Sequence, residues 1–169
     1  IRGREVMVQG WYQGGISVFD WTDPAKPIEI AYHDRGPTAA ERGSDGGSWS
    51  VYWYNGSIVS SEIARGLDIF ELQPSAFISR NELDAAKTVV LREMNAQEQP
   101  QFVWPPSFAL ARAYVDQLER NRSLPAERIA SLRSELASAE KMKGSQRANA
   151  LNALSTKLHG EARGRGRRS

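Results

Sequence analysis

The sequence predicts an α+β protein in which antiparallel strands come first and helices follow. The first observation is a repeat, because residues 6–20 return 51 positions later as residues 57–71, with Gly15 aligned on Gly66. The second is a change in composition: eleven of the fifteen aromatic residues precede position 80, and none follows Tyr114. A strand-rich unit repeated at about this length is typical of β-propeller blades. We therefore expect the terminal blades of a propeller, followed by a small three-helix module.

Composition limits the other possibilities. The 169 residues, 40% hydrophobic and 25% charged, suit one ordinary soluble domain or two small ones. The chain has no cysteine, so neither a disulfide framework nor a thiolate metal site is expected. No run approaches the roughly 20 apolar residues that cross a bilayer, so no transmembrane segment is predicted. Because the sequence begins at Ile1 without a methionine or signal-type segment, we expect a C-terminal fragment whose remaining blades and targeting signal are missing.

Alternating hydrophobic residues and turn residues predict an incomplete set of blades over residues 1–78. The expected strands cover residues 6–12, 16–21, 28–32, 49–54, 57–63 and 66–72. Gly14 and Gly15 supply the positive φ of a tight turn between the first two strands, and Asn55-Gly56 predicts a hairpin. Between the third and fourth strands, residues 35–47 read as a polar loop.

Helical patterns follow the strands. Ser79 and Glu82 have the spacing of a capping box, which predicts a short helix ending near residue 90. With the Pro- and Gln-rich stretch behind it, this helix makes residues 79–105 a connector. Three narrow apolar stripes then predict a three-helix module over residues 106–160, since none is wide enough to be stable alone. Residues 161–169 are expected to be a disordered basic tail.

Two blocks carry a family resemblance. Residues 15–27 read Gly-Ile-Ser-Val-Phe-Asp-Trp-Thr-Asp-Pro-Ala-Lys-Pro, and residues 66–71 read Gly-Leu-Asp-Ile-Phe-Glu. They resemble the LVIVD repeat, in which a glycine precedes a hydrophobic strand ending in Asp, followed by a Ser/Thr-Asp-Pro turn. The second block departs from the pattern, with Glu71 in place of the aspartate and no Asp-Pro turn. The resemblance implies propeller blades in a bacterial, extracellular or cell-surface protein, and it implies no set of catalytic residues.

Glu62, Arg65 and Asp68 form the first candidate binding site, because they cluster around the turn into the last strand. They could project into a propeller channel and bind an ion or polar ligand, Arg65 offering two parallel donors. Alternatively, they form a local set of salt bridges at a turn.

His33 and Asp34 form a second candidate at the end of a predicted strand. A metal site or an acid–base pair there needs another converging ligand, and Asp45 is the nearest acidic residue in the loop. The alternative is that both are solvated loop residues.

The aromatic residues of the strands suit two roles. They could line a ligand-binding face or fill the core between blades, and the group comprises Trp11, Tyr12, Trp49, Tyr52, Trp53 and Tyr54.

The motifs that mark common enzymes and cofactor sites do not occur in the sequence. It holds no nucleophile elbow, phosphate loop, paired-histidine metal motif or dinucleotide fingerprint. We therefore assign no catalytic residue, metal or cofactor. The favoured function is a non-enzymatic surface or secreted scaffold that binds an unknown protein or surface ligand. One alternative is an enzyme or ligand-binding propeller whose site lies mostly in the missing blades. The other is a nucleic-acid contact through the Arg-rich tail, which is disfavoured because that tail lacks interleaved aromatics.

Overall fold

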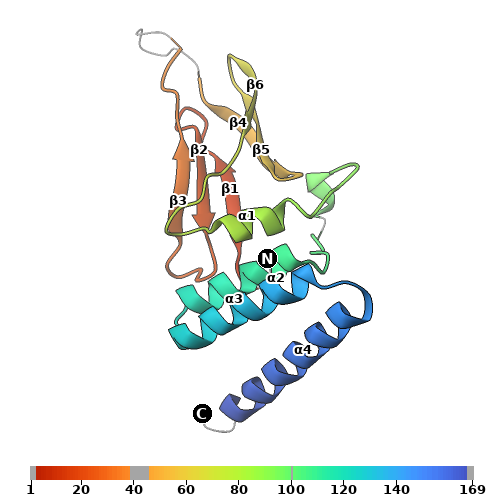
Figure 1. Cartoon of the computed structure of the whole chain (residues 1–169). Coiled ribbons are helices and arrows are strands. Elements are labelled where there is room, and N and C mark those ends of the chain that lie inside the picture. Colours follow the sequence, from red (N-terminus) through yellow and green to blue (C-terminus); the bar gives the residue numbers. More distant parts are fainter. Residues whose placement is uncertain (1–2, 39–45, 100, 167–169) are drawn as a thin grey trace. The chain divides into compact units, whose positions relative to one another are not determined.

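The computed structural model describes residues 3–38, 46–99 and 101–166, in two compact units (Figure 1). The first unit runs to Pro105 and the second begins at Pro106. Within the described residues, the first unit holds two three-stranded antiparallel sheets, one short α-helix and a 3-10 turn, and the second holds three helices. The chain is therefore α+β, with the sheets before the helical unit. The described strands close no ring, so the propeller blade stays a prediction.

The first sheet is a meander in the order β1-β2-β3. Its strands are β1 (Val6–Gly10), β2 (Ile16–Asp20) and β3 (Ile28–His33). Gly15 ends the predicted turn with φ +73°, and a Cβ there would lie 2.2 Å from the backbone oxygen of His33. Only glycine fits this position, because a side chain would be strained by the positive φ and would collide with the neighbouring strand.

The second sheet has the order β4-β5-β6. Its strands are β4 (Ser48–Tyr54), β5 (Ser57–Glu62) and β6 (Gly66–Phe70). Asn55 and Gly56 both have positive φ, 49° and 86°, which is the conformation of the predicted two-residue hairpin turn. β4 lies beside β1, and the backbone N–H of Ser48 donates to the Tyr12 carbonyl at 2.8 Å.

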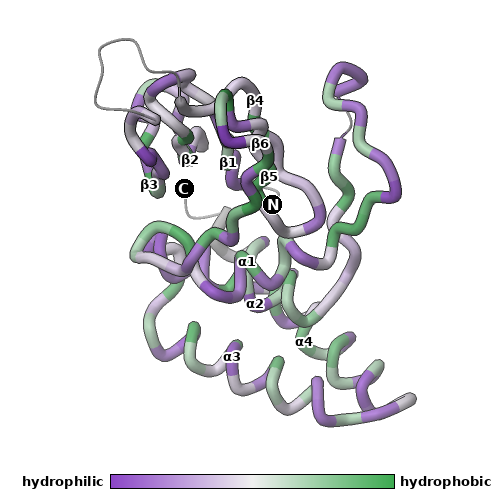
Figure 2. The backbone as a smooth tube through the Cα atoms, turned by 90° about the horizontal axis from the view of Figure 1, so that it is seen from above, coloured by the Kyte–Doolittle hydropathy of each residue, from purple (hydrophilic) through white to green (hydrophobic). Residues whose placement is uncertain are grey.

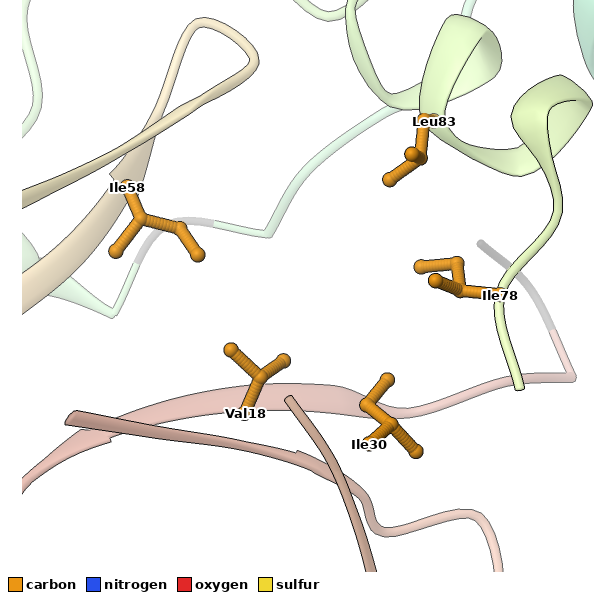
Figure 3. Packing of buried hydrophobic residues seen from close by; sticks show 5 residues of the cluster. All are labelled: Val18, Ile30, Ile58, Ile78 and Leu83. Carbon is orange, nitrogen blue, oxygen red and sulfur yellow. The ribbon is translucent and has the colours of Figure 1, made fainter. Parts of the chain in front are cut away.

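The hydrophobic core of the first unit lies between the two sheets and is closed at one end by a helix (Figure 3). Val18 and Ile30 of the first sheet face Ile58 of the second, and Ile78 and Leu83 complete the cluster. Alternate residues of a strand point to opposite faces, so each sheet uses only one face for this contact.

The short helix α1 (Arg80–Ala86) begins at the predicted capping box. The Ser79 hydroxyl accepts from the Glu82 N–H at 3.2 Å, and the Glu82 carboxylate accepts from the Ser79 N–H at 2.7 Å. The helix ends at Ala86, before residue 90, and just beyond its end the Thr88 hydroxyl donates to the Ala85 carbonyl at 2.7 Å. Further along, the Asn55 side chain accepts from the Leu91 N–H and donates to the Leu91 carbonyl. The segment that we predicted as a connector with a short helix belongs to the first unit, as its described residues 79–99 and 101–105 show. It also contains one turn of 3-10 helix, η1 (Ala96–Glu98).

The second unit consists of three helices, each of which contains both hydrophobic and hydrophilic residues (Figure 2). They are α2 (Phe108–Arg120), α3 (Ala126–Lys141) and α4 (Gly144–Gly166). The three predicted stripes meet in one core, whose buried members are Val115, Ile129, Leu132, Leu136 and Leu154. Ion pairs add to this packing, since Arg133 of α3 bonds both Asp116 and Glu119 of α2. None of the helices in the described part of the chain is long and apolar enough to cross a membrane.

Part of the segment that we predicted to be a disordered tail is helical. We placed its start at residue 161, but α4 continues to Gly166. Within this part of α4, the Glu161 carboxylate pairs with the Arg128 guanidinium of α3 at 3.0 Å and 3.1 Å. A charged residue held against a neighbouring helix adds a tertiary contact that composition alone does not reveal. Residues 167–169 lie outside the described part of the chain.

Candidate functional site

Of the three residues predicted as a site at the turn into β6, the structure bonds Glu62 to Arg65, and Glu62 is the centre of the local hydrogen bonds. One carboxylate oxygen accepts from the Gly47 N–H at 2.8 Å and from the Arg65 guanidinium at 2.8 Å. The other accepts from the backbone N–H groups of Ala64, at 2.9 Å, and of Arg65. The Glu62 side chain is buried, so its charge is balanced by donors that the surrounding turn supplies. These four bonds close the β5–β6 turn and tie it to the start of β4.

The pKa of Glu62 is held below its usual value of 4.5. Burial of the carboxyl would by itself raise the pKa, but the N–H groups of Gly47, Arg65 and Ala64, together with the Arg65 charge, outweigh it. Both oxygens of the carboxylate are already occupied. The arrangement is that of a structural carboxylate rather than one waiting for a proton or a ligand.

Asp68 pairs with a residue that the sequence did not indicate. Its carboxylate accepts from the Arg35 guanidinium, 33 positions earlier in the chain. Arg65 reaches the same segment, donating to the carbonyls of Gly36 at 3.4 Å and Pro37 at 3.3 Å. The chain after β3 is thus fixed to the second sheet by two arginines. No local motif predicts this pairing, because it depends on how the two sheets stack.

His33 and Asp34 do not converge on a common point. The His33 ring lies against Phe70 of the second sheet, 4.5 Å between ring centres, and its Nε2 has no hydrogen-bond partner among the described residues. Asp34 accepts from the Gly36 N–H at 2.8 Å, a bond within its own turn. Asp45, the third member of the predicted set, lies outside the described residues. In the part of the chain that is described, no group of three or more His, Cys, Asp or Glu residues could hold a metal ion.

The space between these residues is small. A hollow of about 10 Å³ is lined by His33, Arg35, Glu62 and Asp68 together with residues of the neighbouring strands. That volume holds about one water molecule. An organic ligand therefore has no room at this cluster. We interpret Arg35, Glu62, Arg65 and Asp68 as polar contacts that hold the chain after β3 to the second sheet.

The aromatic residues divide between contacts within the unit and its outer surface. Tyr12 packs edge-on against Trp49, 4.9 Å between ring centres, although both are exposed. Phe19 lies between Trp11 and Trp21, at 6.3 Å and 6.2 Å, on the face of the first sheet that points away from the core. The outer face of the first sheet therefore carries a row of three aromatic rings.

The two copies of the repeat expose opposite faces. In β2, Ile16 and Val18 point into the core and are 5% and 3% exposed. Their counterparts 51 positions later, Leu67 and Ile69 of β6, point outward and are each 65% exposed. In the first strand of the repeat the second copy is the buried one. Ile58 of β5 lies in the core, whereas its counterpart Met7 of β1 faces outward.

The strands of the two sheets are also offset by one. The repeat aligns the hairpin β1–β2 with the hairpin β5–β6. β3 extends the first hairpin beyond β2, whereas β4 extends the second on the other side, next to β5. Among the described strands, β6 therefore pairs with β5 alone, although its counterpart β2 has neighbours on both sides.

Lowering the pH should destabilise the first unit, and Glu62→Gln should remove much of that dependence. A carboxyl whose pKa is lowered by folding stabilises the fold above its unfolded pKa, and loses this contribution as the pH falls through its folded pKa. We expect the melting temperature of the variant to be lower than that of the wild type near neutrality, and to change less between about pH 5 and pH 3. Tryptophan fluorescence reports the transition, because all five tryptophans lie in the first unit.

Glu93→Gln is the control, since Glu93 is exposed. Equal pH dependence in the wild type and Glu62→Gln would show that Glu62 does not stabilise the turn.

Comparisons with models of known protein families, with curated proteins and with solved structures found no match to this chain. The LVIVD resemblance therefore stays a prediction.

Proposed function

We propose that this chain belongs to a non-enzymatic interaction scaffold, surface-exposed or secreted, built from stacked propeller repeats of the LVIVD type. The observation that carries the proposal is the opposite exposure of equivalent residues in the two copies. Ile16 and Val18 are covered by the second sheet, while Leu67 and Ile69 present the equivalent surface to solvent. Scattered exposed apolar residues are normal on a protein surface. Here, however, the equivalent residues of the first repeat are buried against another sheet, so we expect the exposed residues of the second repeat to bind a further sheet of the same kind.

The stacking of the two sheets is head-to-tail. The inner face of the first sheet, with Val18, contacts the face of the second that carries Ile58. If equivalent faces of the two sheets had met, both copies of that face would be buried and no further sheet could add to them. A head-to-tail contact instead leaves one uncovered face at each end of the stack. Further sheets can add to these faces until the stack closes into a ring, or it grows as a filament.

The strand offset supports the same proposal. If the hairpins β1–β2 and β5–β6 are superposed, the two sheets combine into one order of four strands. β4 lies at one edge, the shared hairpin forms the two central strands, and β3 lies at the other edge. This composite is a four-stranded antiparallel meander, the size of a propeller blade. Each sheet of the chain would then be one strand short of the full repeat, the first at its β1 edge and the second at its β6 edge.

The polar cluster favours a scaffold over catalysis at this end of the sheets. Glu62 and Asp68 are bonded to Arg65 and Arg35, and the hollow beside them is the size of one water molecule. The surfaces with room for a partner are instead the two broad outer faces. Antibody labelling of intact cells that produce the protein tests the surface location.

The chain by itself should associate in a concentration-dependent manner. Each molecule offers Leu67 and Ile69 at one end and the Met7 and Phe19 face at the other, and a second copy can supply the contact made inside the chain. Ile69→Lys places a charge at the centre of the first surface and should yield monomers. Sedimentation velocity across a dilution series measures the effect.

Val90→Lys is the matched control, because Val90 is an equally exposed apolar residue outside both sheets. We expect it to associate like the wild type. A wild-type chain that stays monomeric at every concentration would contradict the proposal.

A further inference from the structure

One edge of β1 has backbone groups that no described strand uses. On the other edge, β1 pairs with β2, and at the start of this ladder the Trp21 N–H donates to the Glu5 carbonyl at 2.7 Å. Hydrogen-bonded pairs alternate along an antiparallel ladder, so Glu5 and every second residue after it bond β2. The N–H and C=O groups of Val6 and Val8 therefore point to the opposite edge. Among the described residues, no strand pairs with β1 on that side.

This free edge borders a cavity of about 540 Å³. β4 lies on the same side of β1, and its first residue, Ser48, forms a bridge to Tyr12 just beyond the end of β1. From there β4 pairs with β5 instead of β1, and the cavity opens between Val6 and Val8 on one side and Trp53 on the other. Val6 is 43% exposed, so the edge can be reached from solvent.

In the second copy of the repeat, the equivalent edge is occupied by β4. Val8 corresponds to Val59 of β5, 51 positions later, and Val59 pairs with Tyr52 of β4. Tyr54 and Ser57 flank the two-residue turn, so they form a hydrogen-bonded pair, and alternation makes Tyr52 and Val59 the next such pair. β5 thus bonds β4 through the same backbone groups that β1 leaves free.

The cavity beside the edge suits large apolar side chains. Val18 and Ile58 face each other across this region, and Leu83 approaches from α1 (Figure 3). Trp53 and Phe102 add an aromatic wall, with 5.4 Å between their ring centres. In strand addition to a sheet edge, backbone hydrogen bonds supply affinity and pockets for alternate side chains supply specificity.

We propose that the free edge of β1 binds an extended strand from a further repeat, antiparallel and in the register that β4 has on β5. The residues of that strand equivalent to Tyr52 and Tyr54 bond Val8 and Val6. Directly opposite residues share a face of the sheet, so their side chains enter the cavity that Val6 and Val8 line. This contact rests on the scaffold function and adds to it a second way in which the repeats join.

A peptide with the sequence of residues 48–54, carrying fluorescein and two lysines at each end for solubility, is the probe. Ile69→Lys is the host chain, because it blocks an outer face and leaves the β1 edge intact. Fluorescence anisotropy should show saturable binding of one peptide per chain. No saturable binding would overturn the proposal.

Two methylated peptides test the backbone pairing. Methylation of the peptide nitrogen at the position of Tyr52 removes the N–H that faces Val8 and should weaken binding about tenfold or more. Methylation at the position of Trp53 is the matched control, because that N–H points away from β1 and its loss should change binding little. Equal affinity of the two methylated peptides would contradict strand addition in this register.

Two substitutions at one position locate the edge. Val6→Pro removes an N–H from the free edge at the first residue of the strand, where proline is tolerated, and should weaken peptide binding about tenfold. Val6→Ala shortens the same side chain but keeps the N–H, and should bind more tightly than Val6→Pro. Equal binding by the two variants would place the peptide elsewhere, such as the β6 edge, and contradict the proposal. If Val6→Pro does not fold, the methylated peptides still decide the outcome.

Self-association of the wild-type chain separates this contact from the stacking of the sheets. Selective peptide binding by a chain that stays monomeric would contradict the stacking and support the strand addition. Self-association without peptide binding would contradict the strand addition alone.

Discussion

Replacing Arg4 by methionine should lower the free energy of unfolding of the first unit by about 3–5 kcal/mol, the usual range when one member of a buried ion pair is removed. Arg4 precedes β1, and Glu82 lies in α1, so this pair joins two segments 78 residues apart. Without the guanidinium, the buried Glu82 carboxylate loses the ion pair that it makes with Arg4 at 2.5 Å, and its capping bond to the Ser79 N–H is kept. Tryptophan fluorescence during urea unfolding measures the change.

Arg92→Met is the matched control, because it removes an exposed arginine from the same unit. Surface substitutions of this kind usually change stability by less than about 0.5 kcal/mol. If Arg4→Met and Arg92→Met had the same effect, the buried ion pair would not hold α1 to the sheets.

Leu132→Ala should destabilise the second unit by about 2–5 kcal/mol, because it opens a cavity in a small core. Leu132 is almost completely buried in α3 and packs with Ile129 and Leu136 in the three-helix cluster. We expect the helical circular dichroism signal to melt at a lower temperature, while the tryptophan signal of the first unit changes little. The two probes separate the units because no tryptophan follows residue 105.

Leu151→Ala, at a half-buried position of α4 outside the core cluster, is the comparison and should cost less. A tryptophan transition that shifts together with the helical one in Leu132→Ala would show that the two units unfold together.

Local signals in the sequence predicted the elements but not how they meet. Asn55-Gly56 and the Ser79 capping box depend on neighbouring residues, and both occur as expected. The helix after Ser79 is shorter than predicted, and beyond it Asn55 bonds Leu91, a contact between segments 36 residues apart. Helix propensity reveals neither the exact end of a helix nor the distant segment that binds the chain beyond it.

The candidate site shows the same division. Glu62, Arg65 and the turn into β6 could be recognised because they are close in sequence. The Arg35–Asp68 pair and the Arg4–Glu82 pair could not, since each depends on the placement of distant elements. The repeat predicted equivalent strands in the two copies. It could not predict that their equivalent faces would have opposite exposure, because alternation shows that a strand has two faces but not which one is covered.

The head-to-tail stacking of the repeats is tested most directly by mixing two variants that are each blocked at one face. Ile69→Lys keeps the Met7 face intact, and Met7→Lys keeps the Leu67 and Ile69 face intact. Each variant alone should be monomeric. Mixed in equal amounts, they should form one-to-one dimers and nothing larger, because the two blocked faces end the assembly. Sedimentation velocity of the mixture, compared with each variant alone, measures this. We predict that dimers form in the mixture and that neither variant forms them by itself. A mixture that stays monomeric while the wild type associates would contradict head-to-tail stacking.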